Sequence, residues 1–249
     1  MIRKIMEKDV PSGMSSPFLS LVLANSRSQT ESCDGLYSAE NEQGDILFVF
    51  SVKRGLVCIA FAEDFSYTQA AADELQMFFE IMHISEVISN RDARFFSTEN
   101  RKCAFMQLND NVKALSEVCQ LTPASRLNEF AQCYELLSDN KGFFDEWYTE
   151  LSLKLREGTA FGVYAERDGK VVSTALAPWV YSGDCFVSGV FTHPDYRGQG
   201  IATETVKALS LILKNNNIKN IFLWCEPTLV EFYNRTGFVK INEIYIGAK

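Results

Sequence analysis

The stretch THPDYRGQGIATE, residues 192–204, constrains the fold of this 249-residue chain more than any other feature. It follows the β-rich run CFVSGVFT and precedes IATETVKALSLILKNNN, in which apolar residues recur at helical spacing. Glycine lets a backbone come close to a ligand, and the free N–H groups and dipole of a first helical turn favour an anion. The pattern therefore predicts a strand, a turn and a helix, with a phosphate group held at the turn.

Turn signals place antiparallel strands before this unit and a buried strand after it. Asp168-Gly169 joins two β-rich runs within residues 159–180, and Ser182-Gly183-Asp184 leads into the next run. After the predicted helix, IFLWC is a continuous apolar run, which is typical of a strand covered on both faces. The remaining predicted elements are helices over residues 122–139, 143–158 and 229–236 and a final strand over residues 238–246.

The first half of the chain has a similar order of elements. We expect strands at GLYSA, ILFVFSV and LVCIAFA, a helix over residues 68–82, and strands at SEVIS and CAFMQL. The polar segment NDNVKALS, residues 109–116, is the expected linker, so we divide the chain into domains 1–112 and 113–249. The expected fold is α/β, in its α+β form, with two domains that each hold a mixed, mostly antiparallel sheet flanked by helices.

Composition argues against several classes of partner. The net charge is −8 and no basic cluster is present, so we expect no nucleic acid partner. The seven cysteines form no CxxC pair and there are only two histidines, so we expect no metal and reduced, mostly buried thiols. The charged start MIRKIMEKDVPSG and the short apolar run FLSLVLA predict neither a signal peptide nor a membrane span. The expected location is the cytoplasm.

Three kinds of phosphate-binding loop use glycine in this way. The P-loop needs G-x-x-x-x-G-K-[ST], which the chain lacks. The dinucleotide fingerprint needs G-x-G-x-x-G, but Thr203 stands at the third glycine position and the preceding strands belong to hairpins. The acyl-CoA loop R-x-x-G-x-[GA] is matched by Arg197, Gly200 and Ala202, with Gly198 as a further small residue.

Together with FYNRTGF, residues 232–238, this loop resembles the GNAT superfamily of N-acetyltransferases. The resemblance covers about residues 115–249 and includes the pattern Tyr-x-x-x-Gly-Phe formed by Tyr233, Gly237 and Phe238. It implies the acyl-CoA N-acyltransferase fold and an enzyme that transfers an acetyl group from acetyl-CoA to a primary amine by direct attack in a ternary complex. The alternative is a non-catalytic regulatory or scaffold protein that binds CoA. Neither charge nor aromatic content indicates which amine is the acceptor.

The resemblance also implies where acetyl-CoA binds. Its pyrophosphate would lie on backbone N–H groups of the loop, and its pantetheine arm would run as an extra strand beside CFVSGVFT, with the thioester between that strand and IFLWC. A backbone N–H near Val190 would stabilise the oxyanion that forms when the amine attacks. The residues implied to bind the coenzyme are Val190, Phe191, Thr192, Arg197, Gly198, Gln199, Gly200, Ile201, Ala202 and Thr203.

Two further residues are candidates for proton transfer. Tyr233 matches the position that often protonates the departing thiolate, and its alternative role is to pack the short helix against the sheet. Glu226 ends the strand IFLWC, where a base would reach the incoming ammonium group; the alternative is a solvated carboxylate at a strand end. The family often has Asn near this position, so Glu226-Pro227 departs from the usual coenzyme contact.

The N-terminal domain resembles a degenerate copy of the same fold. At its matching junction the sequence EDFSYTQAAADE has no glycine, and Glu63 and Asp64 oppose an anion. Residues 1–112 hold 10 basic and 16 acidic side chains, a net charge of −6. We therefore expect that this domain binds no coenzyme and packs against the catalytic domain.

Overall fold

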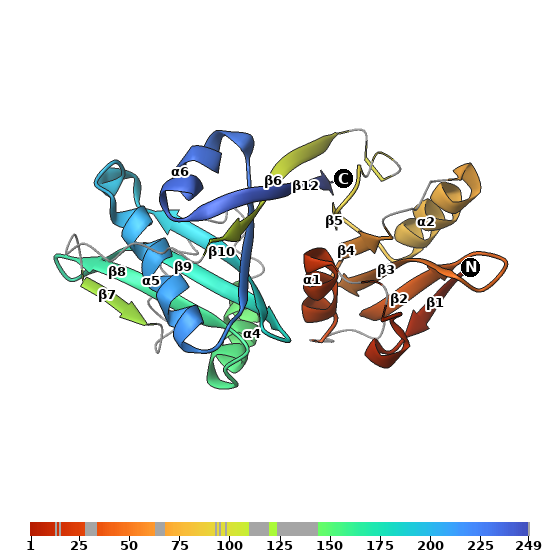
Figure 1. Cartoon of the computed structure of the whole chain (residues 1–249), viewed down its shortest axis with the longest axis horizontal. Coiled ribbons are helices and arrows are strands. Elements are labelled where there is room, and N and C mark those ends of the chain that lie inside the picture. The colour runs from red at the N-terminus through yellow and green to blue at the C-terminus, as the bar shows by residue number, and fades with distance from the viewer. Residues whose placement is uncertain are drawn as a thin grey trace. The chain divides into compact units, whose positions relative to one another are not determined.

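The computed structural model describes residues 1–12, 14, 16–27, 34–62, 68–92, 94, 96–97, 99–109, 120–123 and 144–248, apart from the side chains of residues 144–147. The chain divides into two compact units (Figure 1). Unit 1 contains Met1–Phe105 and Asn242–Lys249, and unit 2 contains Met106–Ile241. The expected boundary after residue 112 lies outside the described residues.

Unit 1 is built on a run of antiparallel strands followed by one parallel pair. Strands β1 to β4 pair antiparallel in succession, and β4 pairs with β5 in parallel. From β2 to β5 the order is three strands, a helix and a strand, as the sequence predicts, whereas β1 and α1 are not predicted. The elements are β1 (Ile2–Ile5), η1 (Glu7–Asp9), α1 (Pro17–Ser26), β2 (Gly35–Glu40), β3 (Ile46–Lys53), β4 (Leu56–Phe61), α2 (Gln69–Ile81) and β5 (Glu86–Ser89).

Apolar side chains on alternate strand positions form the core of unit 1. Phe48, Phe50 and Val52 of β3 lie in one buried cluster with Leu75 and Phe79 of α2. Helix α1 contacts the same strands, and seven of its ten residues are buried. The sequence does not predict α1 because a helix that is apolar on all sides has no amphipathic period.

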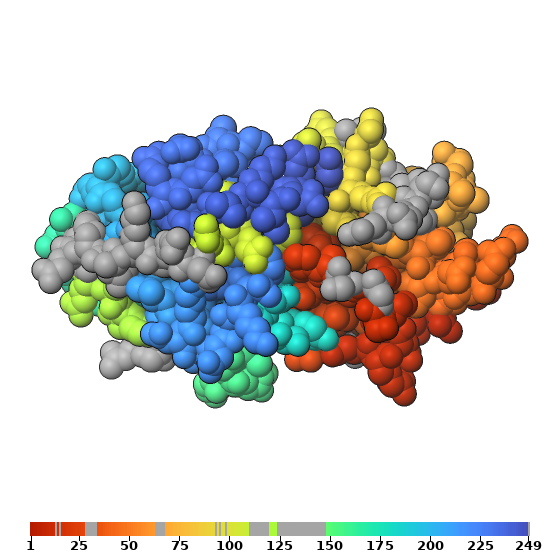
Figure 2. All heavy atoms as spheres, viewed as in Figure 1, coloured from red at the N-terminus to blue at the C-terminus, as the bar shows by residue number. Residues whose placement is uncertain are grey.

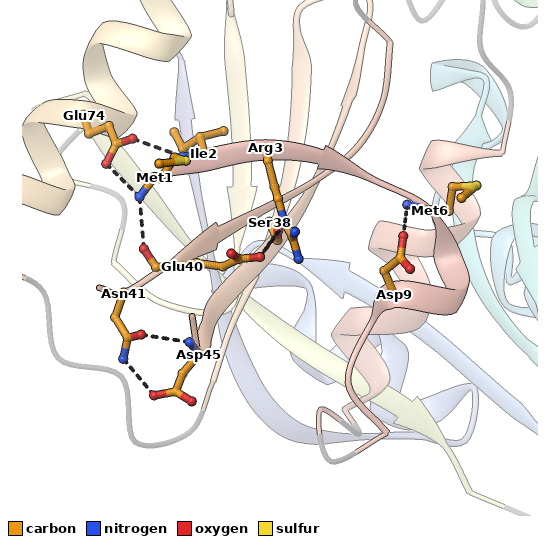
Figure 3. A network of polar contacts seen from close by, with 10 residues as sticks. All are labelled: Met1, Ile2, Arg3, Met6, Asp9, Ser38, Glu40, Asn41, Asp45 and Glu74. Carbon is orange, nitrogen blue, oxygen red and sulfur yellow. Dashed lines mark hydrogen bonds and ion pairs between the residues drawn. The ribbon is translucent and has the colours of Figure 1, made fainter. Parts of the chain in front are cut away.

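Side chains also hold the edge of unit 1 in place (Figure 3). Glu74 of α2 accepts the backbone N–H of Ile2 at 3.0 Å, and Asp9 accepts that of Met6 at 2.9 Å. In the turn between β2 and β3, the side chain of Asn41 accepts the backbone N–H of Asp45 at 2.8 Å. These contacts satisfy N–H groups that no neighbouring strand would reach.

Unit 2 begins with antiparallel strands and ends with a parallel pair and short helices. Strands β7 to β10 pair antiparallel in succession, β10 pairs with β11 in parallel, and helix α5 packs on β8 and β9 (Figure 1). The elements are β7 (Gln120–Pro123), α4 (Phe144–Arg156), β8 (Phe161–Arg167), β9 (Lys170–Tyr181), β10 (Asp184–Thr192), η3 (Pro194–Tyr196), α5 (Ile201–Asn215), β11 (Asn220–Cys225), η4 (Pro227–Leu229) and α6 (Val230–Arg235).

The predicted hairpin turns of unit 2 are confirmed. Asp168 and Gly169 both have positive φ, 53° and 73°, and Ser182 and Gly183 have 50° and 89°. Two successive residues of positive φ make the tight turn that follows the twist of a hairpin. The helix expected over residues 122–139 does not begin at Thr122, because Thr122 and Pro123 belong to strand β7. The remaining residues of this expected helix lie outside the described residues.

The strands form one mixed sheet of 12 strands in the order β1-β2-β3-β4-β5-β12-β6-β11-β10-β9-β8-β7, flanked by helices. Strands β6 (Asn100–Leu108) and β12 (Phe238–Ala248) each contain residues of both units. The expectation of a separate sheet for each domain is therefore corrected. Two strands that run through the division between the units keep the hydrogen-bond order continuous.

Candidate active site

The turn before α5 has the geometry that the glycines predict. Gly200 has φ 79° and is the N-cap residue of α5, and Gly198 has φ 76°. A Cβ atom added to either glycine would meet nothing within 4 Å, so the space in front of both is open. Residues with a Cβ atom rarely adopt a backbone conformation with positive φ, so glycine is favoured at both positions. The turn therefore presents bare backbone at the N-terminus of a 15-residue helix.

The first turn of α5 supplies donors for an anion. Among the described residues, none accepts a hydrogen bond from the N–H groups of Ile201, Ala202 or Thr203. The fourth N–H, that of Glu204, bonds to the carbonyl of Gly200 at 3.1 Å. Three such donors at the positive end of a helix dipole form a favourable position for a phosphate group.

Side chains of the turn are used to hold its shape. Arg197 Nε donates to the carbonyl of Thr192 at 3.0 Å, which ties the turn to the end of β10. Gln199 Nε2 donates to the carbonyl of Asp195 at 3.3 Å, and Gln199 Oε1 accepts a hydrogen bond from Arg167 Nη1. Any contact of a ligand with this turn is therefore expected mainly from backbone N–H groups.

A buried ion pair lies in the same helix. Glu204 is 3% exposed, and its Oε1 lies 2.9 Å from Lys207 Nζ. A carboxylate in the first turn stabilises the helix dipole, but it also opposes an incoming anion. Lys207 offsets this repulsion beside the open turn.

Strands β10 and β11 stop pairing before they end. Their parallel ladder has three residue pairs and finishes at Phe186 and Phe222. On its other side, β10 changes register against β9 between Phe186 and Ser188 and again between Ser188 and Phe191. Backbone groups near the carboxyl end of β10 are thus not used by the β11 ladder. This is the place where the resemblance puts the pantetheine arm and the thioester.

Gly189 sits in the irregular part of β10. Its φ is 56°, and a Cβ atom there would lie 2.8 Å from Leu176 Cδ1. Leu176 is 5% exposed and belongs to a buried cluster, so it has little room to move. Only glycine fits this position without strain.

Buried hydroxyl groups from β9 and α5 hold the end of β10, and the sequence analysis does not identify them. Ser173 Oγ donates to the carbonyl of Phe191 at 2.7 Å and lies 2.8 Å from Thr192 Oγ1. Thr174 Oγ1 donates to the carbonyl of Gly189 at 3.1 Å. Thr205 Oγ1 lies 3.2 Å from Ser173 Oγ. The available sequence signal is the polar pair Ser-Thr within the apolar run VVSTALA.

Tyr233 lies in α6 with its side chain 8% exposed. Its ring makes edge contacts with Phe232 and Phe238 at centroid distances of 4.8 and 6.1 Å. Burial, and after it the nearby Cys225 thiol, raises the pKa of the Tyr233 phenol. None of the described residues hydrogen-bonds its hydroxyl group. Tyr233 is therefore a neutral phenol at physiological pH that keeps its proton available.

Glu226 is exposed and follows β11 directly, as the N-cap residue of η4. Its carbonyl accepts the N–H of Leu229 at 2.9 Å. In Figure 2 the segment with η4 and α6, drawn in dark blue, lies at the surface of the face shown. The neighbouring Cys225 is buried, with its Sγ 3.6 Å from Met106 Sδ, and packs as an apolar group. The chain thus places a carboxylate and a phenol in consecutive elements after β11.

Neither a metal site nor a membrane-spanning helix is found in the part of the chain that the structure describes. Its residues do not gather three or more His, Cys, Asp or Glu side chains in a group able to hold a metal ion. None of the helices described is long and apolar enough to cross a membrane. The four cysteines with described positions, Cys58, Cys103, Cys185 and Cys225, are buried and are not joined in disulfides, in agreement with the expected reduced thiols.

Known proteins are similar to this chain in sequence or in fold. Residues 125–238 match the sequence model of the acetyltransferase (GNAT) family. An uncharacterized N-acetyltransferase, ycf52, of Pyropia yezoensis is 27% identical over 118 residues, which cover 45% of this chain and 68% of that relative. Its counterpart in Porphyra purpurea is 35% identical over 51 residues, 20% of this chain and 29% of that relative.

Two solved structures extend the likeness of fold to the rest of the chain. A GCN5-related N-acetyltransferase from Sphaerobacter thermophilus covers 100% of this chain and 95% of its own length, with TM-score 0.63 and 13% identity. One from Kribbella flavida covers 93% of this chain and 95% of its own length, with TM-score 0.64 and 13% identity. This coverage is consistent with an arrangement of two GNAT-like halves.

The turn at the start of α5 lies beside a parallel strand pair that ends early, which is the arrangement that the resemblance implies for an acyl-CoA site. The chain contains a GNAT-family acetyltransferase domain at residues 125–238. Enzymes of this family are acetyl-CoA-dependent acyltransferases.

Proposed function

We propose that this protein transfers an acetyl group from acetyl-CoA to a primary amine by direct attack in a ternary complex. The observation that carries the proposal is the open turn at Gly198 and Gly200, with three N–H donors behind it at the start of α5. A coenzyme pyrophosphate needs close approach to backbone and an electrostatically positive surface, and this turn offers both. The proposed contacts run from Arg197 to Thr203.

The pantetheine arm is proposed to lie along β10. Val190, Phe191 and Thr192 follow the point where the β11 ladder ends, so an extended ligand can use backbone groups there as a further strand. The Val190 N–H is the proposed donor to the oxyanion that develops on the thioester carbonyl. Gly189 supports this proposed position of the pantetheine arm, because the absence of a Cβ atom allows β10 to bulge beside it.

Two side chains are proposed to move protons. The amine attacks the acetyl carbon as its neutral form, so a carboxylate must first take one proton from the ammonium, and Glu226 is the candidate. The C–N bond forms as the C–S bond breaks, and Tyr233 gives its proton to the departing thiolate. The phenol is protonated at neutral pH, as a proton donor must be, but the raised pKa makes it a weaker acid than an ordinary tyrosine, so the proposed role rests on the Tyr-x-x-x-Gly-Phe pattern and not on this shift. As the amide forms, the nitrogen's second proton returns to the Tyr233 phenolate and Glu226 releases its proton to water, so the products are the acetylated amine, CoA and one proton.

We further propose the domain division 1–112 and 113–249, in which the N-terminal domain, most of which lies in unit 1, is a degenerate copy that takes no coenzyme. Here β4 and β5 pair in parallel over four residues, which end at Ile59 and Ser89. The side chain of Asn90 then accepts the N–H of Phe61 at 2.9 Å and donates to its carbonyl at 3.2 Å. Arg91 Nη2 donates to the carbonyl of Ala62 at 2.9 Å.

The chain's own side chains thus use the backbone of β4 where a pantetheine arm would have to pair. Glu63 and Asp64, which the sequence analysis places at the matching turn, lie outside the described residues.

The proposed function is tested by release of CoA thiol from acetyl-CoA in the presence of an amine panel: spermidine, kanamycin, glycine and a peptide with a free N-terminus and one lysine. We expect amine-dependent thiol release with at least one acceptor, and an acetylated product by mass spectrometry. Tight binding of acetyl-CoA without transfer to any acceptor would favour the second candidate, a regulatory or scaffold protein.

A further inference from the structure

We infer that Thr174 is a positioning residue for acyl transfer: its hydroxyl fixes the Gly189–Val190 peptide so that the Val190 N–H faces the reacting carbonyl. The inference rests on the proposed function. It adds a residue on β9 that would set the rate of transfer without contacting either substrate.

The geometry follows from one hydrogen bond and one peptide plane. Thr174 Oγ1 donates to the carbonyl of Gly189 at 3.1 Å, so this carbonyl points toward β9. The described chain has no cis peptide bonds, and in a trans peptide the carbonyl and the following N–H point in opposite directions. The Val190 N–H therefore points away from Thr174. Since β10 lies between β9 and β11 in the sheet, that direction is the β11 side.

The ladder itself does not fix this peptide. The register between β9 and β10 passes from Ser188 opposite Leu176 to Phe191 opposite Thr174, so no residue of β9 is paired with Gly189 or Val190. Gly189 also has a positive φ, and glycine adopts positive and negative φ about equally readily. The local backbone preference of Gly189 therefore does not hold this peptide in one orientation. The Thr174 side chain provides the missing contact. It is 1% exposed, so water does not compete for its proton.

Transition-state stabilisation by an N–H donor depends on its direction, because only a well-aligned hydrogen bond stabilises the developing charge. Loss of one such donor costs on the order of a hundredfold to a thousandfold in kcat. Loosening its support is expected to cost less. Coenzyme affinity should change little, because the hydroxyl of Thr174 bonds to Gly189 and not to the turn at Gly200 or the first turn of α5.

The test measures kcat for thiol release and Kd for CoA in Thr174→Val, Thr174→Ser and wild type, with acetyl-CoA and the best acceptor of the panel. Valine keeps the shape and removes the donor, so we expect kcat to fall about tenfold or more with Kd for CoA within about twofold. Serine keeps the donor and should restore kcat to within about threefold of wild type.

Ser210→Ala is the matched control, since Ser210 is a buried hydroxyl in α5 that also donates to a backbone carbonyl, that of Val206 at 2.9 Å. Its kcat should stay at the wild-type value.

If Thr174→Val does not fold, Thr174→Cys is measured instead, and its weak S–H donor should give a kcat below that of Thr174→Ser. An unchanged kcat in valine or cysteine, or a loss that appears only in Kd for CoA, would overturn the inference alone. A wild-type chain that releases no thiol with any acceptor would overturn the proposed function and this inference with it.

Discussion

At the scale of single residues, Tyr233 is the proposed proton donor to the departing thiolate. Its phenol is buried, its pKa is raised, and its hydroxyl has no hydrogen-bond partner among the described residues. Phenylalanine keeps the ring and its edge contacts with Phe232 and Phe238 but removes the proton. We expect Tyr233→Phe to lower kcat on the order of a hundredfold or more and to leave Kd for CoA unchanged. Kinetics with acetyl-CoA, together with CoA calorimetry, check this. A phenylalanine variant as active as wild type would leave Tyr233 only its packing role.

The same phenol links stability to pH. Its pKa in the folded chain is raised above the ordinary value of 10.0, so the folded chain keeps this proton at a pH where the unfolded chain loses it. The contribution is fully present below about pH 10 and is lost as the pH rises above it. Urea unfolding at about pH 8 and about pH 11 should show a larger loss of unfolding free energy in wild type than in Tyr233→Phe. Equal losses in the two proteins would contradict the buried, neutral phenol.

At the scale of elements, the bulge of β10 should be sensitive to one methyl group. Gly189→Ala adds a Cβ atom 2.8 Å from Leu176 Cδ1 and keeps a positive φ, so both crowding and backbone strain act. Gly169→Ala is the matched control, with φ 73° and open space. We expect a loss of about 1 kcal/mol for Gly169→Ala and about 2 to 4 kcal/mol for Gly189→Ala, measured by urea unfolding. Equal losses would mean that the bulge does not press on Leu176.

Elements whose conformation depends on local residues could be predicted from the sequence. Asp168-Gly169 requires positive φ and gives a hairpin, and Gly200 requires it at the start of α5. The hydroxyl groups of Ser173 and Thr174 could not be predicted as part of the site, because their partners belong to β10 and are remote in sequence. Helix α1 could not be predicted because its residues are apolar on all sides and show no amphipathic period. The single sheet could not be predicted because it depends on long-range pairing of β6 and β12, which no local sequence pattern encodes.

At the scale of the whole molecule, two halves with the same order of elements are proposed to differ in coenzyme binding. In unit 2, β10 leaves backbone groups for a ligand after its three parallel pairs. In unit 1, Asn90 and Arg91 bond to the backbone that continues β4. The chain is therefore expected to bind one molecule of coenzyme although its fold is similar to GNAT proteins over the full length. Calorimetric stoichiometry decides this point.

We propose that acetyl-CoA binds through the turn at Gly200 and at no other place in the chain. The most direct test is isothermal titration of CoA into wild type and into Gly200→Glu, with circular dichroism to confirm that both are folded. Glutamate would place a side chain and a negative charge in the open space where the pyrophosphate approaches, so affinity should fall at least about a hundredfold. We predict one CoA per chain in wild type and no measurable binding in Gly200→Glu. Two CoA per chain, or an unchanged Kd in the folded variant, would contradict the claim.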